Sequence, residues 1–169
     1  MAVPYDRGVF TLSLDFELVW GSRDLVDPLD PLIAEAMTTR NVVFGALLDM
    51  LRDCGMTATW ATVGHLFLGE AHRVHGVLHP DIVPPAHKWL RRSWFEGVPE
   101  GNEAEHPAFY WRSLVQRLQA AGQEIGSHSF SHPIFGDPGC SRETADSEMA
   151  RCVAEAARMI GAGSFGALL

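Results

Sequence analysis

The chain has 169 residues and a formal net charge of −8; 47% of its residues are apolar and 20% are charged. This length and composition are typical of one well-buried soluble domain. The negative charge argues against binding to a nucleic-acid phosphate backbone as the main function.

The beginning of the chain and its cysteines bear on its location. The first eight residues show no apolar run after a basic start, so no signal peptide is visible. No segment reaches the roughly 18 apolar residues that span a bilayer. The three cysteines lack CxxC spacing and are interpreted as free thiols in a reducing compartment. We therefore expect a cytoplasmic protein without a membrane span.

Strands and helices are predicted to alternate along the chain. Short apolar runs indicate strands buried on both faces, and apolar residues at helical spacing indicate helices between them. A glycine after a helical pattern and a serine before one are the expected caps. In chain order, the predicted elements are a strand over 9–14, a loop over 24–31, a helix over 40–52 closed by Cys54-Gly55, a strand over 56–63, an irregular insertion over 69–107, a helix over 108–121, a strand over 123–127, and a helix from the N-cap Ser141 to about residue 160.

This order predicts an α/β fold in which crossover helices join parallel strands. Only three clear strands are present, and three strands do not close a barrel, so the chain is expected to form part of a larger architecture. The insertion over 69–107 is longer than an ordinary connection, and loops of this length are usually functional or mobile.

Two histidines directly follow the last predicted strand, in the sequence His128-Ser129-Phe130-Ser131-His132. Imidazoles four positions apart can reach one metal ion if the backbone makes a helical turn or a compact loop between them. The carboxyl ends of strands are where α/β proteins gather their active sites. In a chain with eight histidines such a pair can also arise by coincidence, so the motif alone does not decide the question.

Two acidic residues, Asp15 and Glu17, end the first predicted strand. Residues two apart point to the same side of an extended strand, so both carboxylates can face the histidine pair. Two imidazoles and one carboxylate with open positions suit zinc or another divalent first-row metal, and the remaining carboxylate suits a general base. Alone, the acidic pair could be a solvated strand end or a helix cap. Together with the histidines it predicts a metal site.

Three segments carry a resemblance to a known family: Ser13-Leu14-Asp15-Phe16-Glu17, Thr57-Ala58-Thr59-Trp60-Ala61-Thr62-Val63-Gly64 and Gly126-Ser127-His128-Ser129-Phe130-Ser131-His132. Together they resemble the polysaccharide deacetylase (NodB-homology) family, and the histidine motif in its strand context is the most specific of the three. The resemblance spans about residues 8–160. It defines a partial domain over 8–169 that contains the insertion over 69–107.

The resemblance implies a (β/α) barrel-like fold, of which this chain supplies the first three βα units. It implies hydrolysis of N- or O-acetyl groups on a saccharide, with a divalent metal, Zn²⁺ as the expected ion. Asp15 matches the catalytic base, and His128 and His132 match the metal-binding histidines. Glu17 is assigned as the third ligand. Because the common motif has adjacent aspartates, Asp15 could instead bind the metal directly and reverse the two roles.

The resemblance is incomplete downstream. The later strands of the family carry an Arg-Pro motif and a Leu-x-His segment whose histidine protonates the leaving amine, and nothing after Ile160 matches either. The lack of a general acid typically lowers the rate by about 10²–10⁴-fold. We therefore expect either a truncated, weakly active chain or one that another chain completes.

Aromatic residues supply candidates for substrate contact. Trp89, Trp94 and Phe95 of the insertion could form a sugar-stacking surface or could pack the loop onto the barrel. Trp20, just past the acidic pair, could line the same pocket.

Three functions are compatible with these residues. The first is a metal-dependent hydrolase that deacetylates a saccharide or sugar conjugate. The second is a hydrolase of a small amide or imide substrate with the same site. The third is a non-catalytic fragment that retains the metal site. None of the three involves a nucleic-acid partner.

Overall fold

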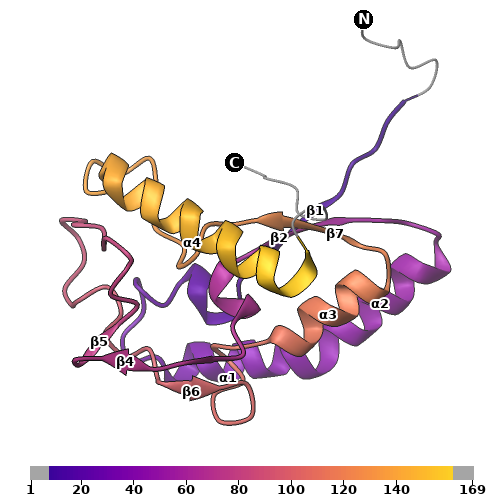
Figure 1. The fold of residues 1–169 in the computed structure, drawn as a ribbon. Helices are drawn as coiled ribbons and strands as arrows, with labels where there is room; N and C mark the ends of the chain where they lie inside the picture. Colours follow the sequence, from indigo (N-terminus) through magenta and orange to yellow (C-terminus); the bar gives the residue numbers. More distant parts are fainter. Residues whose placement is uncertain (1–7, 162–169) are drawn as a thin grey trace, which may run out of the picture.

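The computed structural model describes residues 8–161, and its centre is a three-stranded sheet with the order β1-β2-β7 (Figure 1). Both pairings are parallel, and the register places Ser13, Thr59 and Glu124 side by side. The strands are β1 (Ser13–Phe16), β2 (Thr59–Thr62) and β7 (Glu124–Ser127). Parallel strands joined by helices confirm the predicted α/β class, whereas closure into a barrel and the domain boundary at residue 169, which lies outside the described residues, stay predictions.

The strands are shorter than the apolar runs that predicted them. β1 begins at Ser13 instead of residue 9 and continues through Asp15, and β2 begins at Thr59 instead of residue 56. The reason is pairing, because the strands begin opposite one another in a common register. Val9 and Phe10 precede that register and are accordingly exposed.

The two faces of the sheet differ in burial. One face carries Phe16, Trp60 and Ile125, which are 1%, 1% and 3% exposed. The rings of Phe44 and Trp111 cover this face, with centroids 5.0 and 5.5 Å from that of Phe16. The opposite face carries the exposed side chains of Ser13 and Asp15. Asp15 therefore projects from the face that is more exposed along β1.

Two helices begin at other residues than predicted, and neither has a side-chain cap at its N-terminus. The helix predicted over 40–52 begins at Asp30, because Pro31 is tolerated in the first helical turn, and a π-helical turn joins its two halves. The next helix begins at Arg112 instead of residue 108. The last begins after Ser141, whose side chain accepts an amide hydrogen bond as predicted. The helices are α1 (Asp30–Thr38), η2 (Thr39–Val43), α2 (Phe44–Asp53), α3 (Arg112–Ala120) and α4 (Arg142–Ile160).

The insertion over 69–107 is irregular, as predicted, but it is packed against the core. Its residues Leu78, Trp94 and Val98 are 1%, 4% and 2% exposed. Two short antiparallel pairs brace it: β3 (Glu70–Ala71) with β6 (Gly101–Asn102), and β4 (Arg73–Val74) with β5 (Val77–Leu78). Two single 3₁₀ turns, η1 (Leu18–Gly21) and η3 (Gly64–Phe67), follow β1 and β2.

The structure also bears on two predictions, that the cysteines are free and that the chain has no membrane span. Cys54, Cys140 and Cys152 are all free, as predicted. Among the helices of the described range 8–161, none is both long and apolar enough to cross a membrane.

Candidate metal centre

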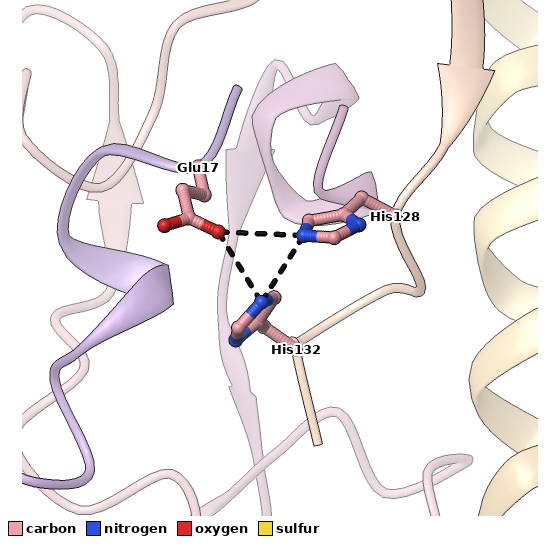
Figure 2. Close-up of side chains that lie close together, drawn as sticks. All are labelled: Glu17, His128 and His132. Atoms are coloured by element: carbon pink, nitrogen blue, oxygen red, sulfur yellow. Dashed lines mark hydrogen bonds and ion pairs between the residues drawn. The ribbon is translucent and has the colours of Figure 1, made fainter. Parts of the chain in front are cut away.

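Three side chains meet at the carboxyl edge of the sheet (Figure 2). Glu17 directly follows β1, His128 directly follows β7, and His132 lies four residues further along the loop. Glu17 Oε2 lies 3.4 Å from His128 Nε2 and 3.2 Å from His132 Nε2. The two Nε2 atoms lie 3.2 Å apart. The structure thus brings together the three residues that the sequence predicts as metal ligands.

The separations of these atoms fit one tetrahedral divalent ion. Zn²⁺ binds imidazole nitrogen and carboxylate oxygen at about 2.0–2.2 Å, and a tetrahedron with such bonds has edges of roughly 3.3–3.6 Å. The observed separations of 3.2–3.4 Å are close to that edge, so one ion can contact all three atoms. Two imidazoles and one carboxylate leave a fourth position open, which is typical of catalytic rather than structural zinc sites.

Contacts within this triad adjust its charges. The hydrogen bond with His128 lowers the pKa of Glu17, and the same contact raises the pKa of His128. Burial lowers the pKa of His132. Glu17 is therefore ionised and His132 neutral near neutral pH, and these are the forms that bind metal.

Asp15 lies beside the triad but is not among the converging ligand atoms. With Glu17 it lines a cavity of about 280 Å³, whose remaining walls come from η1, α1 and the start of α2. Its negative charge favours the protonated forms of His128 and His132, so it lies within electrostatic reach of both. This arrangement favours Glu17 as the ligand and leaves Asp15 free for another role.

A left-handed turn brings the two histidines together. Ser129 has a φ of 58° and His132 a φ of 65°. Residues other than glycine rarely adopt this left-handed backbone conformation. The Ser129 hydroxyl donates to the carbonyl of His128 at 2.6 Å and accepts from the amide of His132 at 3.0 Å. The imidazole centroids are 4.8 Å apart. The compact loop is therefore held partly by a single serine side chain.

The middle of this loop is anchored to α4 and to the insertion. The fully buried Glu148 accepts hydrogen bonds from the amides of Phe130 at 2.9 Å and Ser131 at 2.7 Å, and a third from the Ser131 hydroxyl. Trp94 of the insertion donates its indole N–H to Ser131 Oγ at 2.7 Å. Nothing in the sequence around Glu148 indicated this role.

Two glycines allow close approaches on which the site depends. A Cβ added at Gly21 would lie 1.9 Å from Glu17 Oε1, so the Glu17 carboxylate occupies the space that a side chain at position 21 would need. A Cβ added at Gly64 would lie 3.0 Å from Phe130 Cα, and the Gly64 amide donates to the carbonyl of Ser129 at 2.8 Å. The sequence suggested that Trp20 and Gly21 line the pocket, and Gly64 ends a segment that carries the family resemblance, but it did not indicate the close approaches at the two glycines.

Trp20, the predicted substrate-binding residue, lies in the core. It is 1% exposed, its indole N–H donates to the Phe109 carbonyl at 3.1 Å, and the Arg23 guanidinium lies 4.7 Å from its ring centroid. This burial does not favour direct contact with a substrate. Of the insertion aromatics, Trp94 is buried, whereas Trp89 and Phe95 are half-buried.

Comparisons with known proteins identify the family. A family model described as "Polysaccharide deacetylase" matches residues 37–164, a range that includes both histidines but neither Asp15 nor Glu17. A search of curated proteins finds no match.

A solved structure supports the fold. The chain is similar to a crystal structure described as that of a "putative polysaccharide deacetylase" from Mycobacterium smegmatis, with a TM-score of 0.57 and 14% sequence identity. The similarity covers 94% of this chain and 43% of that one, so this chain spans less than half the length of that protein. At this identity the similarity establishes the fold alone. Because the family model matches well over half of its residues, the chain belongs to the polysaccharide deacetylase family.

Proposed function

We propose that this chain carries the metal centre of a carbohydrate deacetylase that hydrolyses N- or O-acetyl groups on a saccharide or sugar conjugate in the cytoplasm. The observation that carries the proposal is the convergence of Glu17, His128 and His132 in a chain of this family. The reaction adds water across the bond between the acetyl carbonyl and its nitrogen or oxygen. It releases acetate and leaves an amine or a hydroxyl on the sugar.

The residues of the site divide the chemistry between them. Glu17, His128 and His132 supply one oxygen and two nitrogens for a divalent ion, with Zn²⁺ as the expected metal. Such an ion, when bound there, would polarise the acetyl carbonyl and lower the pKa of a water molecule toward about 7. Asp15 lines the cavity beside Glu17, where its carboxylate can accept the proton of the attacking water.

Metal content and turnover in four variants test these roles. Glu17→Gln and His128→Ala are expected to lose bound Zn²⁺, measured by elemental analysis after dialysis. Asp15→Asn is expected to keep Zn²⁺ and to lower acetate release from acetylated sugars by about 10²–10⁴-fold. His72→Ala, which changes an exposed histidine outside the triad, is the control. Unchanged metal content in His128→Ala refutes the site, and metal loss in Asp15→Asn reverses the two carboxylate assignments.

A metal-binding chain without turnover is the second candidate. The observation that favours it is the lining of the cavity beside Asp15, where the described residues include no histidine that could protonate a leaving group. Stoichiometric Zn²⁺ binding without acetate release from any acetylated sugar would support this candidate. Amine release from small amides or imides, without action on sugars, would instead support the small-substrate hydrolase.

A further inference from the structure

A second, larger cavity opens between the segment after η1 and the insertion. Its volume is about 710 Å³, and its walls are residues 24–27 on one side and Trp89, Arg91, Arg92 and Glu96 on the other. We call it the Trp89 cavity. Sites for small ligands typically have volumes of about 300–1,000 Å³, and this cavity lies within that range. It is larger than the cavity of about 280 Å³ beside Asp15.

The indole ring of Trp89 is held in a fixed orientation. One of its faces stacks on the ring of His87, with an interplanar angle of 10° and a centroid distance of 4.8 Å. Its N–H donates to Asp137 Oδ2 at 3.1 Å, and Asp137 Oδ1 lies 2.8 Å from His87 Nδ1. The His87 side chain is 0% exposed and forms a rigid support. Trp89 is half-buried and also lines the cavity, so it offers a ligand a flat apolar surface that needs no ordering on binding.

The opposite wall is fixed to the insertion as well. Arg92 donates to the carbonyl of Val26 at 3.0 Å and to that of Arg23. Arg23 in turn donates to the Trp94 carbonyl at 2.5 Å, and its guanidinium lies 4.5 Å from the Trp94 ring centroid. Both walls are therefore preformed, as is usual for ligand sites.

The charges on the walls favour a neutral, hydroxyl-rich ligand. Asp24, Asp27 and Glu96 supply three carboxylates, against the two guanidinium groups of Arg91 and Arg92. This mixture gives no excess of positive charge to hold a phosphate or another anion. Carboxylates accept hydrogen bonds from hydroxyls, guanidinium groups donate to ring and hydroxyl oxygens, and an indole face packs against the C–H face of a pyranose. A saccharide presents all three kinds of group.

The Trp89 cavity is tied to the metal centre. Trp94, which donates to Ser131 of the metal loop (residues 128–132), accepts a hydrogen bond from Arg23 next to the cavity wall. Asp137, which holds Trp89, lies in the loop that continues from His132. The cavity wall and the segment that carries the metal loop are therefore joined by hydrogen bonds through Trp89 and Trp94.

We propose that the Trp89 cavity is a saccharide subsite that binds a sugar unit adjacent to the acetylated one, with Trp89 as its stacking platform. The proposal rests on the proposed function for the identity of the ligand, but it concerns binding and not turnover. It assigns one insertion aromatic, Trp89, to the substrate and another, Trp94, to the packing of the metal loop.

The test measures binding of a tetramer of N-acetylglucosamine by calorimetry, in the Zn²⁺-loaded protein with an Asp15→Asn background that prevents turnover. Trp89→Ala is expected to weaken binding by roughly tenfold or more, and Trp89→Phe, which keeps a flat ring, by less. Arg91→Ala removes an exposed donor from the wall without touching the core, and a several-fold loss is expected. Phe10→Ala removes an aromatic that is 76% exposed and precedes β1, at the opposite end of the sheet from the metal centre. This control is expected to bind as the parent does.

Each outcome decides the subsite separately from catalysis. Equal affinity in Trp89→Ala, in Arg91→Ala and in the parent refutes the subsite even if acetate release is confirmed. Failure of the parent to bind the tetramer at millimolar concentration also refutes it. Binding that depends on Trp89 and Arg91 supports the subsite even if no acetate is released, in which case the proposed function fails alone.

Discussion

Replacement of Glu148 by leucine is the perturbation that tests most directly how the metal loop is held. Leucine keeps most of the side-chain volume but removes the acceptor for the amides of Phe130 and Ser131 and for the Ser131 hydroxyl. His128 and His132 flank these two residues, so a loop that relaxes here also changes the separation of the imidazoles. We expect the variant to lose both stability and affinity for Zn²⁺.

The magnitudes can be worked from the hydrogen bonds. Each buried amide left without an acceptor costs about 1–3 kcal/mol. Burial raises the pKa of Glu148, so the charged carboxylate is itself unfavourable, and its removal offsets part of that cost. A net loss of about 2–4 kcal/mol is expected, within the stability of roughly 5–15 kcal/mol of a typical domain. Zn²⁺ affinity is expected to fall by about 10–100-fold, as when the supporting partners of metal ligands are removed.

Two further variants separate positioning from general destabilisation. Glu148→Gln keeps a carbonyl oxygen for the two amides, so Zn²⁺ affinity should stay within about threefold of the parent value. Glu155→Leu removes another buried carboxylate of α4, one that pairs with Arg151 and Arg158 and not with the loop. It should lower the free energy of unfolding in urea but not the Zn²⁺ affinity, measured by competition with a chromophoric chelator. If folded Glu148→Leu binds Zn²⁺ as tightly as the parent does, the reasoning is wrong.

Three other predictions follow from particular contacts. Gly21→Ala pushes the Glu17 carboxylate aside and should weaken Zn²⁺ binding at least tenfold with little change in stability, as chelator competition and urea unfolding would show. Gly64→Ala should lower the free energy of unfolding by about 1–3 kcal/mol through overpacking, whereas Gly45→Ala, in open space on α2, should raise it by about 0.5–1 kcal/mol. His79 is buried, and burial lowers its pKa from 6.5 to about 4. As the pH drops from about 6.5 to about 4, this residue takes up a proton in the unfolded chain before it does so in the folded one. The free energy of unfolding should therefore fall by about 3 kcal/mol over this range because of His79. His79→Asn, which suits the φ of 53°, should flatten that slope in unfolding curves recorded across this pH range.

The sequence predicted the ligands because their signals are local and chemical. Two histidines and two acids stand directly after apolar runs, and parallel strands bring such positions to one edge of the sheet. Ser141, Cys54 and Gly55 marked helix ends correctly because caps satisfy backbone groups within a few residues. The parallel direction of the strands and the position of the metal site follow from these features together.

The residues that hold the metal loop in place could not be predicted in the same way. Ser129 and His132 adopt left-handed backbone conformations that neither residue type signals. Glu148 is a charged residue in a sequence with the pattern of an amphipathic helix, and charged residues of such a helix usually face the solvent. Its only distinguishing mark is that it lies one turn from Thr144 and Cys152, both buried. The acceptor role becomes visible only when α4 is placed against a loop 17 residues away in sequence.

The same long-range packing changes how the insertion is interpreted. Loops of this length are usually functional or mobile, yet Trp94 is buried and donates to Ser131, which also donates to Glu148. One hydroxyl thus links the insertion, the metal loop and α4. Removing the insertion would therefore leave Ser131 Oγ with one partner fewer and uncover the apolar surface beneath Trp94. The insertion thus supports the metal loop through Trp94, while residues further out, among them Trp89 and Arg91, line the Trp89 cavity.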